Sequence, residues 1–556
     1  MINTKLISSM EKCFLDEDLS TKFALDRDAI LSDERYSFQL GIYDDGPESG
    51  TSLTVEIDSP LADCITLYKI ESVPVRFPMY RKLNPDFYDN FCRLTPGLYP
   101  DIMRPYKDYG VFKILTEELN SLWVEVDPRG AYPAGTYPIT IRLRNVANGT
   151  LEAENTFTLE ILAAKLPPQT MLYTEWFHTD CLSVYYDAPV FSEKYWKIVE
   201  SFMKNAVRNG INLILTPTFT LALDTDIGGE RPTVQLVDVT VTNGEYAFSF
   251  DHLERWINLA HACGIENFEI AHFFTQWGAK HAPKVMATVD GEYKRIFGWD
   301  TDATGPEYTA FLRQFVTELL QFLRARGIDK NCYFHISDEP GRDCLPEYSA
   351  AKDIVRDLLA DYVIMDACSS YELYESGALE SPIPCVDSAA KFIAHDVPDL
   401  RVYYCCVQYV GVSNRFMAMP LDRTRAIGYQ FYKFNIAGFL QWGYNFYFTR
   451  GSSYAVDPYL NTDGDHMAPA GDCFSVYPGP DGQAIDSIRA SAFFDALQDC
   501  RAMKLAESLV GREAVMNAIE GDLSEDEKIT FVRYPHGPEW MHRTRAKINA
   551  LIRDNI

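Results

Sequence analysis

The sequence predicts a multidomain α/β protein, with an N-terminal antiparallel β-sandwich over residues 1–166, a (β/α)₈ TIM barrel over residues 169–509 and a short helical C-terminal extension over residues 510–556. Three observations predict this fold class. The first part of the chain alternates apolar and polar residues with period two. The second part alternates strand-like and helix-like segments. The chain has 556 residues, which is too long for a single hydrophobic core.

Short alternating segments separated by turn residues characterise the N-terminal part. Residues 36–42 and 137–143 place apolar side chains at every second position, and turn sequences such as Asp-Asp-Gly and Asn-Gly separate such segments. This spacing is typical of an antiparallel sandwich. Residues 80–109 are rich in proline and tyrosine and predict a long loop that reaches another domain.

Pro167 and Pro168 mark a linker, after which eight strand candidates alternate with helices or compact connections. The strands are expected at residues 171–176, 211–214, 267–271, 333–336, 362–365, 383–386, 401–407 and 438–442. The longer helices are expected at residues 193–209, 253–263, 306–326, 347–360, 421–437 and 484–509. This alternation predicts parallel strands, and eight units predict a closed barrel. A doubly wound open sheet is the alternative, but the chain has no glycine-rich phosphate loop to support it.

The composition limits the partners and the location that we expect. The formal net charge of -28 argues against nucleic acid and an anionic membrane surface as partners. The first residues do not read as a signal peptide, and no run of about 18 apolar residues occurs, so a cytoplasmic protein is expected. Thirteen cysteines without CxxC pairs predict reduced thiols.

Residues 331–340, NCYFHISDEP, combine an apolar strand candidate with two adjacent acids, Asp338 and Glu339. Pro340 cannot donate to a continuing ladder, so the strand is expected to stop where the charges begin. One interpretation is that the acids cap the next helix. The other is a catalytic site, because catalytic residues of (β/α)₈ barrels lie at the C-terminal ends of the strands.

Polar and aromatic residues follow most of the predicted strands and would share one rim. Aromatic faces, amides and carboxylates together predict a carbohydrate site. The expected substrate-binding residues are Trp176, His178, His272, Trp277, His335, Asp387, Tyr404, Gln408, Trp442 and Asn445. Histidines and acids of this set could ligate a metal, but no HExxH spacing exists, so a metal is not expected. A serine hydrolase is disfavoured because no GxSxG motif occurs.

The distribution of carboxylates favours one glycosidase mechanism. The seventh strand candidate, RVYYCCVQYV, has no carboxylate at its end. Neighbouring residues on one strand point to different sides, so Asp338 and Glu339 are not expected to flank a scissile bond as acid and nucleophile. In substrate-assisted hydrolysis of a 2-acetamido sugar the acetamido oxygen is the nucleophile. Glu339 would then protonate the leaving oxygen, and Asp338 would hold the acetamido N–H. The second geometry pairs Glu339 with Asp387 or Asp366.

Several segments carry a resemblance to a known family. They are TEWFHTDCLSVYYD (174–187), NGINLILTPTF (209–219), ISDEP (336–340), QWGYNFY (441–447) and GDCFSVYPGPDGQAIDSIR (471–489). The chain resembles the DUF4091 family, which is related to glycoside hydrolase family 123, the β-N-acetylgalactosaminidases. The resemblance implies a retaining, exo-acting β-N-acetylhexosaminidase without cofactor, GalNAc as the favoured sugar, Asp338 and Glu339 as the catalytic pair, and Trp442 as a sugar-stacking residue.

Two other functions stay open at this point. One is a glycosidase for a non-acetamido sugar that uses Glu339 with Asp387 or Asp366, and the other is a non-catalytic glycan-binding protein. In each case the expected partner is a small oligosaccharide or glycoside, and neither nucleic acid nor a membrane. Residues 510–556 would pad the barrel bottom or join a dimer, so a homo-oligomer is left open.

Overall fold

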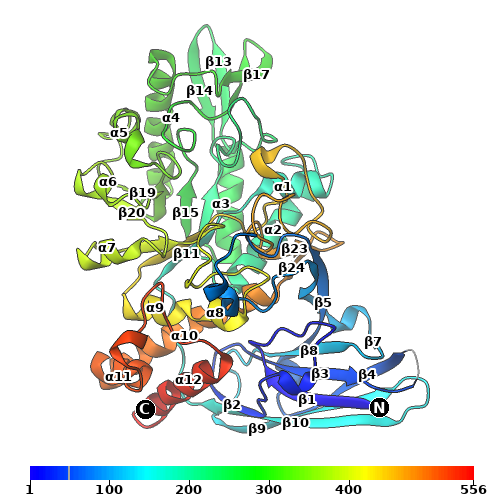
Figure 1. The fold of residues 1–556 in the computed structure, drawn as a ribbon. Helices are drawn as coiled ribbons and strands as arrows, with labels where there is room; N and C mark the ends of the chain where they lie inside the picture. Colours follow the sequence, from blue (N-terminus) through cyan, green and yellow to red (C-terminus); the bar gives the residue numbers. More distant parts are fainter. Residues whose placement is uncertain (48–49) are drawn as a thin grey trace.

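The computed structural model describes residues 1–47 and 50–556 (Figure 1). The N-terminal region consists of two five-stranded sheets. One has the order β1 (Ile2–Ser8), β3 (Tyr36–Asp44), β8 (Leu119–Val126), β5 (Ile65–Val75) and β6 (Gly97–Pro105). The other has the order β2 (Arg27–Leu31), β10 (Leu151–Leu162), β9 (Gly135–Asn145), β4 (Gly50–Asp58) and β7 (Phe112–Leu115). The predicted β-rich N-terminal region is confirmed.

The apolar faces of these two sheets form one core. Phe38 on β3 and Phe157 on β10 stack with ring centroids 4.0 Å apart, and both side chains are fully buried. One pairing differs from the antiparallel prediction, because β2 runs parallel to β10, with Arg27 opposite Thr158. Two strands so far apart in the chain can pair in either direction, since no tight turn joins them.

Residues 80–109 reach the second domain as expected, but they are not a loop throughout. They include strand β6, which pairs with β5. The Cys92 N–H donates to the Ala418 carbonyl at 2.7 Å, and Ile102 forms an isolated bridge with Ser487. Figure 1 shows the N-terminal sheets below the second domain, with β5 reaching up towards β23 and β24.

Eight parallel strands form the framework of the second domain. They are β11 (Leu172–Glu175), β12 (Leu213–Thr216), β15 (Asn267–Ile270), β18 (Cys332–Phe334), β19 (Val363–Ala367), β20 (Ser381–Ile383), β21 (Arg401–Tyr403) and β22 (Gly438–Gln441). They lie in a three-stranded sheet, β11-β22-β21, and a five-stranded sheet, β12-β15-β18-β19-β20.

Backbone contacts join the two parallel sheets at both edges. The Asn212 N–H, just before β12, donates to the Tyr173 carbonyl of β11 at 3.1 Å. Cys385, just after β20, forms a parallel bridge with Tyr403 of β21, and the Val386 N–H donates to the Tyr403 carbonyl at 2.9 Å. The eight strands are therefore linked in sequence order, and β22 pairs with β11.

Helices follow every one of these strands. They are α1 (Thr179–Tyr185), α2 (Glu193–Arg208), α3 (Asp251–Cys263), α4 (Pro306–Ala325), α5 (Leu345–Asp353), α6 (Tyr371–Glu375), α7 (Ala389–Ala394), α8 (Leu421–Arg425), α9 (Ile427–Lys433) and α10 (Ile488–Val510). Helix α2 illustrates the local causes: the Ser192 side chain caps its first turn by accepting from the Tyr195 N–H at 3.2 Å. Helix 347–360 was predicted too long, and helix 421–437 is two helices.

The long segments after β12 and β15 hold structure that the sequence did not indicate. Each forms a hairpin, β13 (Asp238–Thr242) with β14 (Glu245–Ser249), and β16 (Val285–Val289) with β17 (Glu292–Phe297). The hairpins join into one four-stranded sheet that projects at the top of Figure 1. These insertions extend the face on which the strands end.

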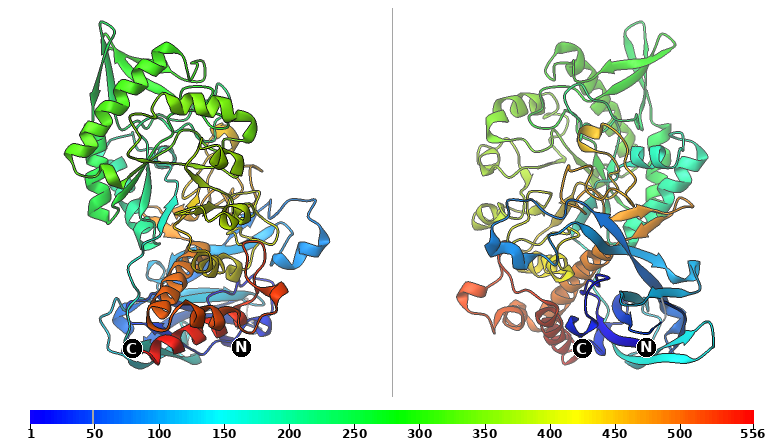
Figure 2. Two further views of the ribbon diagram at one scale, coloured as in Figure 1. Left: turned by 90° about the vertical axis from the view of Figure 1, so that its left-hand side faces the viewer. Right: turned by 45° about the vertical axis from the view of Figure 1, so that its right-hand side comes forward.

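The C-terminal helices connect the two domains. After β23 (Val476–Pro478) and β24 (Ala484–Asp486), which occupy the predicted start of helix 484–509, come α10, α11 (Arg512–Glu520) and α12 (Pro538–Arg553). Figures 1 and 2 show α12 in red beside the N-terminal sheets in blue and cyan. The His542 ring of α12 bonds to Ser8 at 2.8 Å and to Asp28 at 3.1 Å. Among the described residues, no helix has the length and apolar character needed to span a membrane.

Candidate active site

A cavity of about 180 Å³ lies where the parallel strands end. Fifteen residues line it, and six of them were predicted site residues: Trp176, His178, Trp277, Asp338, Glu339 and Trp442. The others are Leu223, Asp224, Gln276, Ala367, Tyr403, Cys405, Cys406, Leu440 and Met467. The structure thus gathers the acid pair and three tryptophans around one small space.

The acid pair lies in a loop and not on the strand. Strand β18 ends at Phe334. Beyond it, individual backbone hydrogen bonds link the chain to the segment after β15; for example, the Trp277 N–H donates to the Asp338 carbonyl at 2.9 Å. Glu339 has a φ of 46° in the left-handed region, which is unfavourable for a side chain of this kind and recurs at functional sites. Because both acids lie in this loop and line the same cavity, the expectation that they point to different sides, as neighbours on a strand would, is wrong.

The alternative role of the acids as a helix cap is wrong. Residues Arg342–Cys344 form a 3₁₀ turn, and α5 begins only at Leu345. Neither of these two elements has a side-chain cap hydrogen bond. The carboxylates are thus available to the cavity.

The two acids differ in their surroundings. Asp338 is half-buried and Glu339 is exposed. Burial and the neighbouring Glu339 carboxylate raise the pKa of Asp338 well above its usual range, and His335 opposes this shift. The Tyr403 hydroxyl donates to Glu339 Oε1 at 2.7 Å.

Tyr403, and not the predicted Tyr404, reaches the cavity. Successive side chains of a strand point to opposite faces. An error of one residue in the prediction therefore selects a side chain that points into the core and not into the cavity. Tyr404 is 1% exposed and packs against Phe439, with ring centroids 4.8 Å apart. The prediction for Tyr404 was therefore wrong by one position.

His335 lies beneath the cavity and does not line it. Its Nε2–H donates to Glu269 at 2.7 Å and its Nδ1–H to Asp366 at 3.0 Å. Burial opposes the charge on this ring, but the two carboxylates outweigh it and raise the pKa of His335 to about 9. Asp366 also accepts from the Tyr348 hydroxyl at 2.7 Å, so this carboxylate is directed to the interior. The predicted roles of His335 in substrate contact and of Asp366 as partner acid do not match these positions.

His272 is also below the cavity, stacked on His335 with ring centroids 4.3 Å apart. It is 2% exposed, and burial together with His335 lowers its pKa well below the usual range. Ligand atoms of His272, His335 and Asp366 lie within 4.8 Å of one another, close enough for a metal ion. The donor set fits a metal poorly, because both ring nitrogens of His335 already carry hydrogen bonds to carboxylates.

His178 lines the cavity in a fixed orientation. Its Nε2–H donates to the Trp442 carbonyl at 2.7 Å, and its Nδ1 accepts from Arg231 at 3.1 Å. Burial and Arg231 lower the pKa of His178 to about 3, so the ring is neutral. Asn445 holds the His178 backbone, accepting from its N–H at 2.9 Å. Asn445 therefore positions a cavity residue and does not itself line the cavity.

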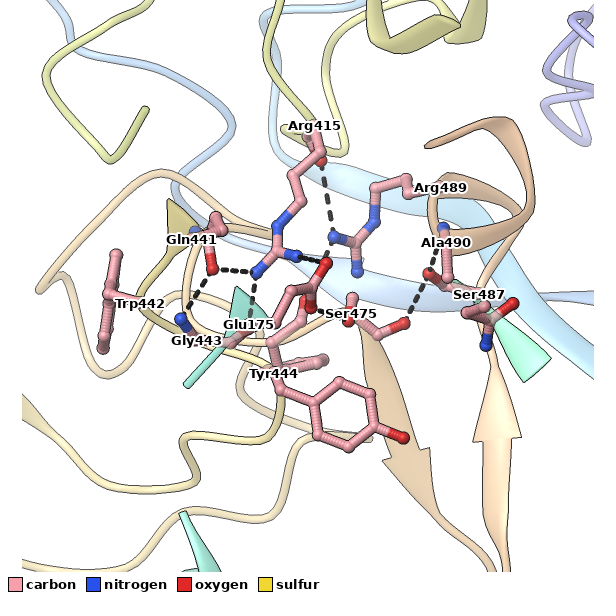
Figure 3. Close-up of polar contacts among 12 residues, drawn as sticks. Glu175, Arg415, Gln441, Trp442, Gly443, Tyr444, Ser475, Ser487, Arg489 and Ala490 are labelled. Atoms are coloured by element: carbon pink, nitrogen blue, oxygen red, sulfur yellow. Dashed lines mark hydrogen bonds and ion pairs between the residues drawn. The ribbon is translucent and has the colours of Figure 1, made fainter. Parts of the chain in front are cut away.

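Trp442 is oriented by a buried polar network at the end of β22. Its Nε1–H donates to Asp472 Oδ2 at 2.9 Å. Arg415 donates to Gln441 at 2.5 Å and forms an ion pair with Glu175 at 2.6 Å. Figure 3 shows Arg415 at the centre of these contacts, with Arg489 beside it. The network ties the end of β22 to β11.

The remaining predicted residues lie outside the lining. Gln408 accepts from the Cys405 N–H at 3.0 Å and donates to Asp387 at 3.4 Å. Asp387 is exposed and does not line the cavity. Sequence reasoning missed Asp224, because it lies in the long segment eight residues beyond the end of β12.

Comparisons with known proteins identify the family and a similar fold. The family model described as glycoside hydrolase 123, catalytic domain, matches residues 176–506. A family 123 glycoside hydrolase from Clostridium perfringens, solved in a study of glycolipid glycan hydrolysis, has a TM-score of 0.74 at 14% identity, covering 100% of this chain and 98% of that chain. At this identity the likeness supports the fold alone.

A second solved structure is much less similar. The β-glucuronidase 2 of Bacteroides uniformis, covalently bound to cyclophellitol-6-carboxylate aziridine, has a TM-score of 0.30 at 11% identity, covering 81% of this chain and 47% of that chain. No curated protein sequence matches this chain. The family match over most of the second domain confirms the predicted relation, and the chain belongs to glycoside hydrolase family 123.

Proposed function

We propose that this protein is a retaining exo-glycosidase that releases a terminal β-linked 2-acetamido sugar, with GalNAc favoured, by substrate-assisted catalysis on a (β/α)₈ barrel. One observation carries the proposal: the adjacent acids Asp338 and Glu339 line the same small cavity. Strand β21 and the residues just after it, where many barrel glycosidases would need a nucleophile, contribute Tyr403, Cys405 and Cys406 to the lining and no carboxylate.

The two acids divide the chemistry between them. Glu339 is exposed and would protonate the glycosidic oxygen as the C1–O bond breaks. The acetamido oxygen of the substrate attacks C1, and Asp338 accepts the acetamido N–H and stabilises the positive charge that develops. Water then attacks C1, Glu339 takes its proton, and two inversions give net retention.

The raised pKa of Asp338 fits this sequence of events. Burial and the neighbouring Glu339 carboxylate disfavour the ionised form of Asp338. An acetamido N–H at Asp338 requires that carboxyl to be an acceptor, so substrate binding would favour the form of Asp338 that accepts this hydrogen bond.

The small size of the cavity supports exo action. Its volume of about 180 Å³ is below the ~300–1,000 Å³ of typical ligand pockets, so it suits a single terminal sugar. Trp176 and Trp442 supply aromatic walls. We propose a small oligosaccharide or glycoside as substrate. The charge of -28 and the thirteen free thiols support a cytoplasmic enzyme without nucleic-acid or membrane partners.

The alternative with a second enzyme carboxylate has less support. Asp366 is bonded to His335 and Tyr348, and Asp387 is exposed outside the cavity lining. A non-catalytic glycan-binding role does not account for two adjacent acids of which one has a strongly raised pKa.

A panel of aryl β-glycosides tests the proposal. We expect turnover of the 2-acetamido galacto and gluco sugars, and inhibition by an N-acetyl thiazoline mimic of the intermediate. Glu339→Gln should abolish turnover, whereas Glu347→Gln, an exposed glutamate on α5, serves as the matched control. Turnover of sugars without the acetamido group, insensitive to the thiazoline, would refute the substrate-assisted mechanism.

A further inference from the structure

Two buried polar atoms of the cavity lining have no partner. They are Oδ2 of Asp224 and Nε2 of Gln276. Asp224 follows β12, and Gln276, which is 6% exposed, follows β15, so they come from neighbouring strands on the second and third units. A buried polar atom without a hydrogen bond costs stability, and a ligand atom can remove that cost.

The structure fixes both groups in place. The Asp224 N–H donates to Gln276 Oε1 at 2.7 Å, which sets the amide so that its NH₂ group is the free end. The Ser452 hydroxyl donates to the Asp224 carbonyl at 2.8 Å and holds the same loop from the other side. Asp224 adopts a φ of 48°, a conformation that aspartate and asparagine tolerate better than most residues. One free acceptor and one free donor therefore lie side by side on a rigid frame.

The charge of Asp224 suits it to accept hydrogen bonds. Burial raises its pKa to about 6, and Arg231 opposes the shift. At neutral pH the carboxylate is ionised and can accept hydrogen bonds from neutral donors. The hydroxyl groups at C3, C4 and C6 of a terminal sugar, which the acid pair does not handle, are neutral donors and acceptors that need such partners.

We propose that Asp224 and Gln276 form the hydroxyl-binding edge of the sugar site and determine which epimer the enzyme accepts. Asp224 Oδ2 accepts from a ring hydroxyl, and the Gln276 NH₂ group donates to that oxygen or to its neighbour. This inference rests on the proposed function for the place of the sugar, and it extends it by assigning residues to the recognition of configuration. An epimer or deoxy sugar would leave both buried groups unpaired, which is the most effective way for a site to reject a substrate.

The variant Asp224→Asn tests the assignment with little change of shape. Its backbone bonds to Gln276 and Ser452 do not depend on the side chain, and asparagine tolerates the same φ. The matched control is Asp226→Asn, an exposed aspartate of the same loop that does not line the cavity. Thermal unfolding and circular dichroism of both variants establish that they are folded.

The measurement is kcat/KM for the best aryl glycoside and for its 3-, 4- and 6-deoxy analogues. Replacing the charged acceptor by a neutral amide with only one acceptor oxygen is expected to lower kcat/KM of Asp224→Asn about 10- to 150-fold for the parent sugar. The effect should fall to less than about threefold for the one deoxy analogue that lacks the bound hydroxyl. Gln276→Leu should show the same pattern, and Asp226→Asn should be unchanged.

Two failures are distinguishable. Equal losses for the parent sugar and all three deoxy analogues, or no loss at all, would overturn the role of Asp224. If the enzyme instead prefers a sugar without the acetamido group, the proposed mechanism fails. The deoxy series of that sugar would then still support or overturn the hydroxyl-binding edge.

Discussion

The ion pair between Asp101 on β6 and Arg489 on α10 gives the sharpest prediction about how the N-terminal domain supports the site. Both side chains are fully buried, and Arg489 donates to the two oxygens of Asp101 at 2.7 and 2.9 Å. The Tyr477 hydroxyl donates to the same carboxylate at 2.5 Å. Asp101→Asn removes the negative charge and leaves the guanidinium buried.

The expected cost can be worked from these contacts. Removing one partner of a buried ion pair destabilises a protein by about 3–5 kcal/mol, because the other charge is left uncompensated. Arg489 also donates to the Gly471 carbonyl at 2.8 Å and the Phe474 carbonyl at 3.0 Å, and these bonds remain in the variant. We therefore expect the lower end, about 3 kcal/mol.

Urea unfolding of the full chain, followed by tryptophan fluorescence, measures the loss. The control is Glu56→Gln, which breaks an exposed pair with Arg144 of 2.9 Å and should cost about 0–1 kcal/mol. Gly471 and Phe474 flank Asp472, the partner of the Trp442 indole, so kcat/KM should also fall while the protein is still folded. A cost for Asp101→Asn no larger than that of the control would refute the reasoning.

Three further predictions concern the acid pair and the histidine below it. Tyr403→Phe removes the donor to Glu339, so kcat/KM should fall about 10- to 150-fold with an unchanged melting temperature, and full activity would contradict a role for the hydroxyl. Asp338 has a raised pKa and costs stability where it is ionised. Asp338→Asn should therefore be more stable than the parent at pH 7, with the gain vanishing below about pH 3.9, and urea titrations showing a gain that grows on acidification would be inconsistent with it. The pKa of His335 is raised to about 9, so its charged ring stabilises the fold fully below about pH 6.5 and ceases to do so as the pH rises through 9. His335→Gln should therefore lose more stability at pH 6 than at pH 10. A loss of stability that is the same at both pH values would exclude the charged ring.

Much of the fold could be predicted because its signals are local. The period-two segments 36–42 and 137–143 lie in strands β3 and β9, and the Ser192 and Pro306 start signals open α2 and α4. The parallel pairing of β2 with β10 was not predictable, since it joins segments more than a hundred residues apart. The hairpins after β12 and β15 were not predicted for a similar reason, because they pair with each other across a long stretch of sequence.

The candidate site was predicted unevenly, and the errors follow from geometry. Four cavity residues were predicted because they are acids or tryptophans at the end of a strand candidate or soon after it: Asp338, Glu339, Trp176 and Trp442. Tyr404 was predicted instead of Tyr403 because the end of β21 cannot be located to one residue from the sequence. That end sets which side chain faces the cavity. His272, His335 and Asn445 were placed at the right strand ends, but the structure buries them as supports.

Local sequence features were sufficient to predict an adjacent acid pair after an apolar strand, within an alternation of strands and helices. These features need only local periodicity and residue chemistry. Only the folded chain shows that Asp224 belongs to the cavity and that Asp366 does not. The physical reason is that membership of a cavity depends on where loops from different strands meet, and on which polar atoms the fold has already paired.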